Sequence, residues 1–288
     1  MERERWLLMY RAALRLDKTS CRGLFSAAAI LGVFFWAVLH DRPVCWACRA
    51  DNWPLGLWRY ALPSQSTMSR RLRDPQVRRL LTLVEESWED DGAAEVKTID
   101  AKPLPVGGHS KDRDVAFGHG MKTMLKGYKF YAIWAPGGLR PIAWRIASMR
   151  VSEQAMALEM IPQLTGGGHL LGDSLYDINK IYDAAGAVGH QLLAPRKCPE
   201  AGFAKYPQSA YRLRGLAQLG TPAGRELHER RDAIERQFGS LTAFGGGLGP
   251  LPAWVRRKQR VHLWVQTKLI INAHRIQKLR QNNPQAVA

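Results

Sequence analysis

The chain has 288 residues, of which 46% are hydrophobic and 23% are charged. This is the composition of a folded globular protein, and it excludes a mainly disordered, collagen-like or fibrous chain. Lys and Arg number 42 against 25 Asp and Glu, a net charge of +17, and residues 196–288 alone hold 17 basic and 5 acidic side chains. This surplus predicts a polyanionic partner, with nucleic acid as the first candidate, along the C-terminal elements.

Helical patterns fill the first third of the chain. Residues 5–16 are amphipathic, and the uncharged run at 23–39 predicts a buried core helix. A membrane anchor is the alternative for that run, because it is only slightly shorter than a membrane span. Residues 55–90 predict a group of short helices that contains a turn at 62–65 and a helix at 68–73. We expect Ser66 or Thr67 to cap that helix, and Asp74-Pro75 to begin the next one.

The helix at 68–73 places Met68 and Leu72 on one apolar face and leaves Ser69, Arg70 and Arg73 pointing outward. A short basic helix after a tight turn is typical of a helix-turn-helix. A solvated basic helix on a helical bundle is the alternative interpretation.

The four cysteines are too few and too scattered for a disulfide framework. Cys45 and Cys48 have the spacing of a zinc knuckle, but no second pair completes four ligands, and we therefore reject zinc. For all four, Cys21, Cys45, Cys48 and Cys198, we expect buried thiols in a reducing cytosol.

Strand patterns begin near residue 95. A short strand at 96–100 is followed by Pro103 and Pro105, which we expect to end it. The later elements predicted are an antiparallel hairpin of 126–134 with 139–149, helices at 152–164 and 178–185, strands at 169–173 and 191–194, a long helix at 221–241 and a basic helix at 254–280. This order predicts an α/β protein with an RNase H-like mixed sheet flanked by helices.

Three acidic residues stand out in this pattern. Asp100 and Asp173 each close an apolar strand, where a carboxylate is costly to desolvate unless a cation or hydrogen-bond donors satisfy it. One such residue is usually a turn or helix cap, but two in one predicted sheet suggest a divalent metal site. Glu235 lies with His228 and Arg231 on the flank of the long helix's apolar face. The alternative for Arg231 and Glu235 is an exposed salt bridge that contributes little.

Five segments stand in a recognisable order: 96–100 (VKTID), 110–114 (SKDRD), 126–129 (KGYK), 171–177 (LGDSLYD) and 231–239 (RDAIERQFG). Together they resemble the bacterial insertion-sequence transposases of the DDE type, over about residues 20–280. The last segment resembles that family's Tyr-x2-Arg-x3-Glu-x6-Lys signature, whose positions are here His228, Arg231, Glu235 and Thr242. Histidine thus replaces the tyrosine, and threonine replaces a lysine to which a terminal phosphate contact is usually attributed. The segment around residues 53–73 also resembles the family's DNA-binding region, which favours the helix-turn-helix.

The resemblance implies a transposase that binds the terminal inverted repeats of its element, cleaves the strands and transfers them by two-metal-ion phosphoryl transfer. Asp100, Asp173 and Glu235 would hold Mg²⁺, for which Mn²⁺ could substitute, and Arg231 would contact a phosphate oxygen or orient Glu235. The implied DNA-binding residues are Ser69, Arg70, Arg73, Lys111, Arg113, Lys126 and His228. We expect Lys129, Arg256, Arg257, Lys258 and Arg260 to contact the DNA backbone as well.

The implied partners are double-stranded DNA, at the element ends and the target, and further copies of the chain in a dimer or higher oligomer on DNA. A cytoplasmic, nucleoid-associated location in a bacterium follows, with no membrane partner. Two alternatives remain: a transposase-derived DNA-binding protein that has lost catalysis, and a stand-alone nuclease of the same fold.

Three regions are predicted: a helical DNA-binding region at 1–92, a catalytic domain at 93–250, and a basic helix at 251–288 packed on the catalytic domain. We expect Asp100 and Asp173 side by side on adjacent strands. Glu235 should face them across a metal spacing of about 4 Å plus two ligand bonds of about 2.1 Å. Without metal, Arg231 or a lysine should fill the gap.

Overall fold

The computed structural model describes residues 2–18, 23–58, 60–88, 91–120, 123–203, 207–244 and 247–282. The chain forms two compact units, residues 1–89 with 241–288, and residues 90–240. In the described part of the chain, no helix is long and apolar enough to cross a membrane.

The first unit is helical. Its helices are α1 (Glu2–Leu16), α2 (Ala27–Leu39), α3 (Val44–Ala47), α4 (Gln65–Arg71), α5 (Pro75–Glu86) and α11 (Lys258–Asn282). The uncharged run forms α2, which is buried along almost its whole length, as a core helix requires. Trp6 on α1 packs against Trp36 and donates its indole N–H to the Gly32 carbonyl at 2.7 Å. A glycine is required at position 32, because a Cβ there would lie 2.8 Å from the Tyr10 ring.

The C-terminal helix corrects the predicted domain division. We expected residues 251–288 on the catalytic domain, but α11 packs on α1, α2 and α5 and belongs to the same unit as the N-terminal helices. Almost every side chain from 261 to 274 is buried. A helix that is buried on all sides must pack against several neighbours, and α2 and α5 are among them. Inside it the Lys268 ammonium donates to the Asp41 carboxylate at 2.6 Å and to the Val38 carbonyl at 3.0 Å.

The helix starts near residue 65 also differ in one detail. Ser64, rather than Ser66 or Thr67, caps α4, and its hydroxyl accepts from the Thr67 amide at 3.2 Å. Asp74 caps α5 with Pro75 in its first turn, as predicted.

The thiols are less buried than expected. Cys45 and Cys48 are half-buried and Cys198 is exposed, whereas Cys21 lies outside the described residues. Burial raises the pKa of the Cys48 thiol to about 11. Cys198 is exposed because it lies in the loop between β6 (His190–Leu193) and α8 (Ala210–Leu219).

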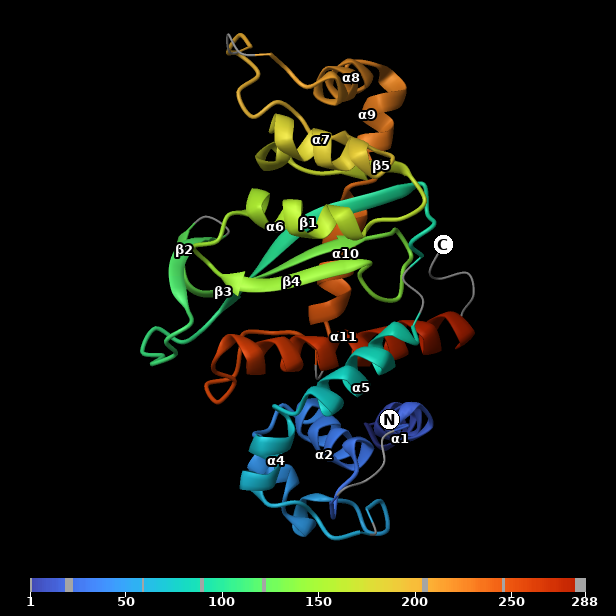
Figure 1. The fold of residues 1–288 in the computed structure, drawn as a ribbon, viewed down its shortest axis with the longest axis vertical. Helices are drawn as coiled ribbons and strands as arrows, with labels where there is room; N and C mark the ends of the chain where they lie inside the picture. Colours follow the sequence, from blue (N-terminus) through green and yellow to red (C-terminus); the bar gives the residue numbers. More distant parts are fainter. Residues whose placement is uncertain are drawn as a thin grey trace. The chain divides into compact units, whose positions relative to one another are not determined.

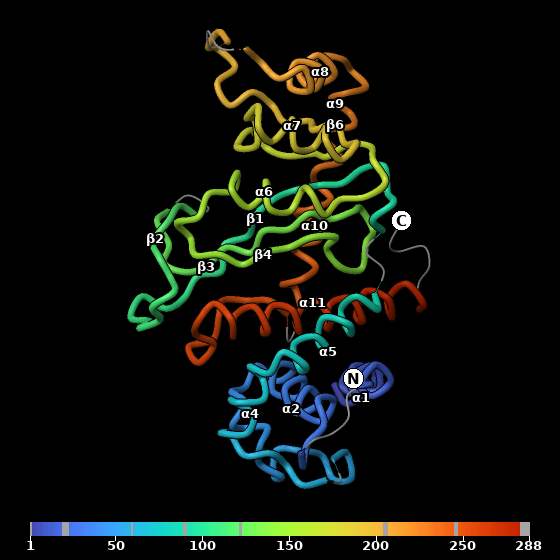
Figure 2. Tube along the Cα trace, viewed as in Figure 1, coloured from blue at the N-terminus to red at the C-terminus, as the bar shows by residue number. Residues whose placement is uncertain are grey.

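The second unit is a mixed, curled sheet covered by helices (Figure 1). Its other strands are β1 (Val96–Pro105), β2 (Ala116–Gly120), β3 (Thr123–Trp134), β4 (Ala143–Ser148) and β5 (Gly168–Leu171), and its other helices are α6 (Glu153–Met160), α7 (Asn179–Ala187), α9 (Pro222–Glu229) and α10 (Asp232–Thr242). The strand order is β2-β3-β1-β5-β6, and β4 pairs with β3. Pairing is antiparallel around β3 and parallel from β1 through β5 to β6. Figure 2 follows the chain through this order, from the green strands β1–β4 to the yellow segment with α7 and β6.

The two faces of the sheet have different cover. Tyr131 and Ile133 belong to a core cluster with side chains of α6 and α7. Phe130 and Trp134, which point to the other face because side chains alternate along a strand, pack against Phe238 of α10. The face of the sheet that carries Phe130 and Trp134 is therefore the face that α10 covers.

Most predicted strands and helices are present, with two differences around β1 and α10. β1 continues through both prolines, and the Val106 amide just after them donates to the Lys126 carbonyl on β3. Because backbone N–H groups alternate in direction along a strand, the nitrogens of Pro103 and Pro105 point away from β3. They face the edge of β1 that β5 leaves unpaired, where no N–H donor is needed. The predicted helix at 221–241 is two helices, α9 and α10, with a tighter turn of i to i+3 hydrogen bonds at Arg230 and Arg231. β2 and α8 were not predicted from the sequence.

Candidate functional site

Asp100 lies within β1, and Asp173 follows the end of the neighbouring strand β5. The last paired residues of β1 and β5 are Thr98 and Leu171. Asp100 and Asp173 each follow these paired residues by two positions, and the negative charge of Asp173 raises the pKa of Asp100. Asp173 thus lies at the carboxyl end of β5. Asp100 pairs with Ala132 on β3 and points to the face of the sheet that α10 covers.

The Asp100 carboxyl group is held in a largely buried position. Its side chain is 20% exposed, and its Oδ1 accepts from the Ala101 amide at 2.7 Å. Burial raises the pKa of Asp100 to about 6, and the negative charges of Asp173 and Glu153 act in the same direction, against the Ala101 N–H and the Arg231 guanidinium. Ionised Asp100 is therefore under-compensated, which is the condition that a bound cation would relieve.

Asp173 lies in a tight turn that begins where β5 ends. Its Oδ1 accepts from the Leu175 amide at 2.8 Å and caps the short 3₁₀ turn Ser174–Tyr176. A Cβ at Gly172 would lie 2.9 Å from the Tyr176 ring, so only glycine lets the chain pass this buried tyrosine. Asp173 is thus fixed by its own turn.

Two side chains hold that turn from outside. The Nε2 of His228, on α9, lies 3.0 Å from the Gly172 carbonyl oxygen and must donate, because a carbonyl can only accept. The Gln154 amide, on α6, donates to the Leu175 carbonyl at 2.8 Å. His228, predicted as a DNA-binding residue, is thus placed in contact with the backbone next to Asp173.

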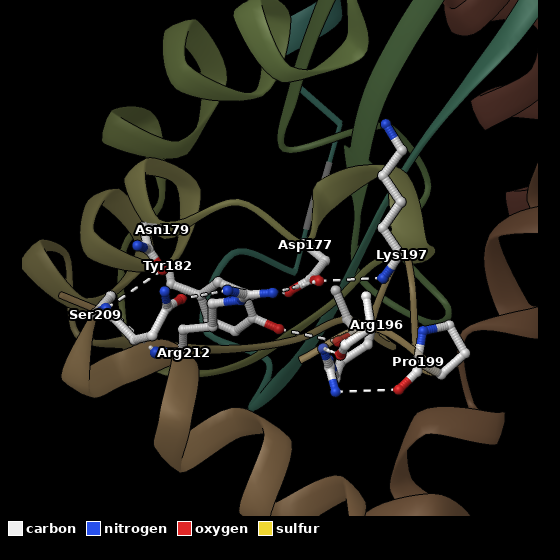
Figure 3. Close-up of polar contacts among 11 residues, drawn as sticks. Asp177, Asn179, Tyr182, Arg196, Lys197, Pro199, Ser209 and Arg212 are labelled. Atoms are coloured by element: carbon white, nitrogen blue, oxygen red, sulfur yellow. Dashed lines mark hydrogen bonds and ion pairs between the residues drawn. The ribbon is translucent and has the colours of Figure 1, made fainter. Parts of the chain in front are cut away.

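An ion pair anchors the far end of the same turn (Figure 3). Arg212 of α8 donates from Nε and from Nη2 to the two Asp177 carboxylate oxygens, each at 2.7 Å. The Lys197 amide donates to the same carboxylate at 3.1 Å, and the Asp177 side chain is only 2% exposed. Bidentate pairs of this kind are the strong ones, so the segment 172–177 is fastened at both ends.

Arg231 bridges Asp100 and Glu235. Its Nη1 lies 3.5 Å from Asp100 Oδ2, and its Nη2 lies 3.3 Å from Glu235 Oε1. Arg231, one of the cations expected between the acids, thus contacts two of the three predicted ligands. The Glu235 side chain is 63% exposed, and among the described residues no group of three His, Cys, Asp or Glu side chains is arranged to hold a metal ion. The link from Glu235 to Asp100 is therefore the guanidinium of Arg231.

Glu153, in the first turn of α6, was not predicted as a site residue. Lys129 of β3 donates to the Glu153 Oε1 at 2.9 Å, and both side chains are 12% exposed. From the sequence, Lys129 was expected only to contact the DNA backbone. The charge of Glu153 raises the pKa of Asp100, and it also raises the pKa of Tyr131 and of Tyr176, although burial is the larger cause for each of these groups. In the sequence, Glu153 is an acidic residue in the first turn of the helix that follows the hairpin. Such a residue indicates only a favourable start of the helix.

The predicted DNA-binding residues lie in both units. On α4, Arg70 is exposed and Ser69 is half-buried; Arg73, in the turn just after α4, is exposed and donates from Nε to the Ser69 carbonyl at 2.9 Å. Lys111 and Arg113 are exposed in the loop before β2. The remaining residue of the set, Lys126 on β3, is half-buried and donates to the Ser110 carbonyl at 2.8 Å.

Comparisons of the chain with models of known protein families, with curated proteins and with solved structures find no match. The assignment of a function therefore depends on the residues and geometry described above.

Proposed function

We propose that the chain is a DNA transposase of the DDE type, which binds the ends of a mobile element, cleaves the DNA strands and transfers them to a target. The observation that carries the proposal is an acid in β1, Asp100, on which the charge of Asp173 just after the parallel strand β5 acts, with Arg231 just before the covering helix α10 and Glu235 on that helix. This arrangement agrees with the ordered motifs that resemble the transposase family. The net charge of +17 supports a nucleic-acid substrate.

The finer fold assignment is part of the same proposal. We infer that residues 90–240 have an RNase H-like fold, in which the first acid lies within a central strand, the second follows a neighbouring parallel strand, and the third is on a late helix. The observed strand order β2-β3-β1-β5-β6 supports it.

The donor set fits Mg²⁺, with Mn²⁺ as a substitute, because it offers carboxylate oxygens and no sulfur or imidazole. Asp100 and Asp173 would hold the ion, together with Glu235 once Arg231 no longer bridges Glu235 to Asp100. The raised pKa of Asp100, caused by burial and by the neighbouring charge of Asp173, supports the fit, since a cation would offset both costs. When bound, the ion supplies a Lewis acid for attack on phosphate.

The chain's own residues then act by position and charge. The sheet fixes the backbone of Asp100, while the contacts from His228, Gln154 and Arg212 fix the turn that carries Asp173. Arg231 presents a guanidinium between Asp100 and Glu235, where it can donate to a phosphate oxygen in place of a carboxylate. Such fixed positive charge near a reacting phosphate contributes to the rate without reorganisation.

DNA affinity would come from residues outside the acid cluster. Arg70 on α4 and Arg73 just after it are exposed, and we propose α4 as the helix that binds the terminal repeat. Lys111 and Arg113 offer contacts to the DNA backbone. Pairing two element ends requires at least two copies of the chain, so we propose a dimer or higher oligomer on DNA, in the bacterial cytoplasm where the nucleoid lies.

The test is to incubate the full chain with duplexes that carry the element's own ends, with and without Mg²⁺, and to score nicked and joined products. Asp100→Asn and Asp173→Asn should abolish both products and keep DNA binding, because affinity rests on phosphate contacts elsewhere. Glu159→Gln is the matched control, since Glu159 is exposed on α6 and lies 3.8 Å from its Arg145 partner. Joined products that persist in Asp100→Asn would contradict the proposal.

A transposase-derived DNA-binding protein without catalysis is the second candidate. The exposure of Glu235 at 63% and the contact of His228 with the Gly172 backbone favour it. It predicts normal binding to element ends and no cleavage at any Mg²⁺ concentration. A stand-alone nuclease would instead give nicked products and no joined ones.

A further inference from the structure

The outward face of β2 and β3 carries large side chains that the fold leaves uncovered. Within the arm formed by residues 116–120 and 123–127, the strand register pairs Phe117 with Lys126 and His119 with Met124. Phe117 is 61% exposed and Met124 is 54% exposed. The Lys126 ammonium lies 5.8 Å from the centroid of the Phe117 ring, in the range of a cation–π contact.

The opposite face of this arm is packed, which fixes the direction of the exposed side chains. A Cβ at Gly118 would lie 2.3 Å from the Met149 carbonyl oxygen, so the backbone of β2 is pressed against the end of β4 at this residue. Side chains alternate along a strand, and Phe117 and His119 therefore project together to the other side. The exposure of Phe117 is a result of the register and not of a frayed edge.

The surroundings of the arm are mainly cationic. His109, Lys111 and Arg113 are exposed in the loop that leads into β2. Asp112 in the same loop is turned inward, where it accepts from the Tyr128 hydroxyl at 2.8 Å. Asp114 is the acid that the described part of this loop exposes.

An exposed aromatic ring beside an ammonium group suits a ligand with a flat π face and a negative charge close to it. An unpaired nucleobase and its phosphate have both, and base–aromatic stacking is largely independent of sequence. A second copy of the chain is a poor partner for this face of the arm, because a twofold contact would place Lys111, Arg113 and Lys126 against like charges.

We propose that the β2–β3 arm binds an unpaired base of the DNA by stacking on Phe117, with Lys126 at the adjoining phosphate. The inference rests on the proposed function for the identity of the partner. Lys126 is six positions along β3 from Ala132, the residue paired with Asp100, a distance of about 20 Å at roughly 3.3 Å per residue. At about 3.4 Å per nucleotide, the stacked base lies about six nucleotides from the phosphate at Asp100.

The experiment compares two DNA probes of the same arbitrary sequence, a fully paired duplex and a duplex with a short unpaired bubble that contains 2-aminopurine. Affinity and 2-aminopurine quenching are measured at about 0.1 M salt, because the affinity depends on salt. The full chain should bind the bubble about tenfold more tightly and quench the fluorophore. Phe117→Ala and Phe117→Leu should lose the preference and the quenching, while Phe117→Trp should keep both.

Phe203→Ala is the matched control. Phe203 is 49% exposed and has the Arg196 guanidinium 4.6 Å from its ring centroid, but it lies outside the arm. It should keep the preference for the bubble. Because Phe117 is mostly exposed, its variants should melt at the temperature of the unsubstituted chain.

The outcomes separate this inference from the proposed function. Binding of both probes with equal affinity, or a preference that survives in Phe117→Leu, overturns stacking at the arm and leaves the proposed function standing. No binding of either probe overturns both. A dimer that sedimentation shows to dissociate in Phe117→Ala, with an unchanged preference for the bubble, overturns the inference in favour of a contact between copies.

Discussion

Asp100→Asn should stabilise the protein at neutral and alkaline pH. The pKa of Asp100 is raised from 3.8 to about 6 in the folded chain, chiefly by burial. Between these two values the folded state binds more protons than the unfolded state, so the stability of the unsubstituted chain falls as the pH rises from about 4 to 6. Asparagine has no charge to desolvate and escapes this loss.

The magnitude follows from the shift. About two pKa units at about 1.36 kcal/mol each give at most about 3 kcal/mol at pH 8, and a smaller gain at pH 4. The value is an upper limit because a side chain that is 20% exposed retains some hydration. A buried carboxylate whose charge lowers the stability of the fold is typical of a site that binds a cation.

The assay is urea unfolding of the full chain and of Asp100→Asn at pH 4 and pH 8, with EDTA present. The difference in unfolding free energy should grow by about 2 kcal/mol between the two pH values. Mg²⁺ in place of EDTA should then stabilise the unsubstituted chain at pH 8 and not the variant. Glu159→Gln, an exposed acid on α6, should change the stability by no more than about 0.5 kcal/mol at either pH. A variant that is less stable at pH 8, or equally altered at both pH values, would refute the reasoning.

Three further predictions follow from the charges and the contacts. DNA affinity should fall about a thousandfold between 50 and 200 mM salt if about six phosphates are neutralised, and a flat response would contradict a nucleic-acid partner. Arg70→Ala with Arg73→Ala should weaken binding to element ends and leave the melting temperature unchanged; retained specificity for the ends would remove α4 as the reading helix. Arg212→Ala should cost about 3–5 kcal/mol in urea unfolding because it leaves the buried Asp177 carboxylate unpaired. Arg214→Ala on the same helix, which is exposed, should cost under about 1 kcal/mol, and equal costs would contradict the importance of the ion pair.

The sequence predicted the strands that precede the two aspartates because their apolar pattern ends at these residues. Ile99 before Asp100, and Leu170 and Leu171 before Asp173, identify strand ends by hydrophobicity alone. The parallel pairing of these strands then follows from the helix between the β4 hairpin and β5. The register that pairs Thr98 with Leu171, two residues before each aspartate, depends on tertiary contacts that no local pattern reveals.

Other features depend on contacts that no local pattern reveals. β2 was missed because AFGHG has weak strand propensity, and pairing with β3 makes it a strand. α11 was assigned to the wrong unit because a basic helix with a buried centre resembles a surface helix until its neighbours are known. Glu153 was missed for the same reason, since its charge acts on Asp100 only because α6 packs over the sheet.

The two aspartates are positioned in different ways, and this decides where further positioning residues lie. Asp100 is within a strand that is paired along its length with β3, so the sheet alone sets its backbone. Asp173 follows the end of β5, and its turn is set by Gln154, His228 and Arg212, which come from α6, α9 and α8. Substitutions on three separate helices should therefore affect the same carboxylate. His228→Gln keeps an N–H donor and should retain strand transfer, whereas His228→Leu should lose it without loss of DNA binding. Equal activity of the two variants would show that the hydrogen bond to Gly172 does not position Asp173.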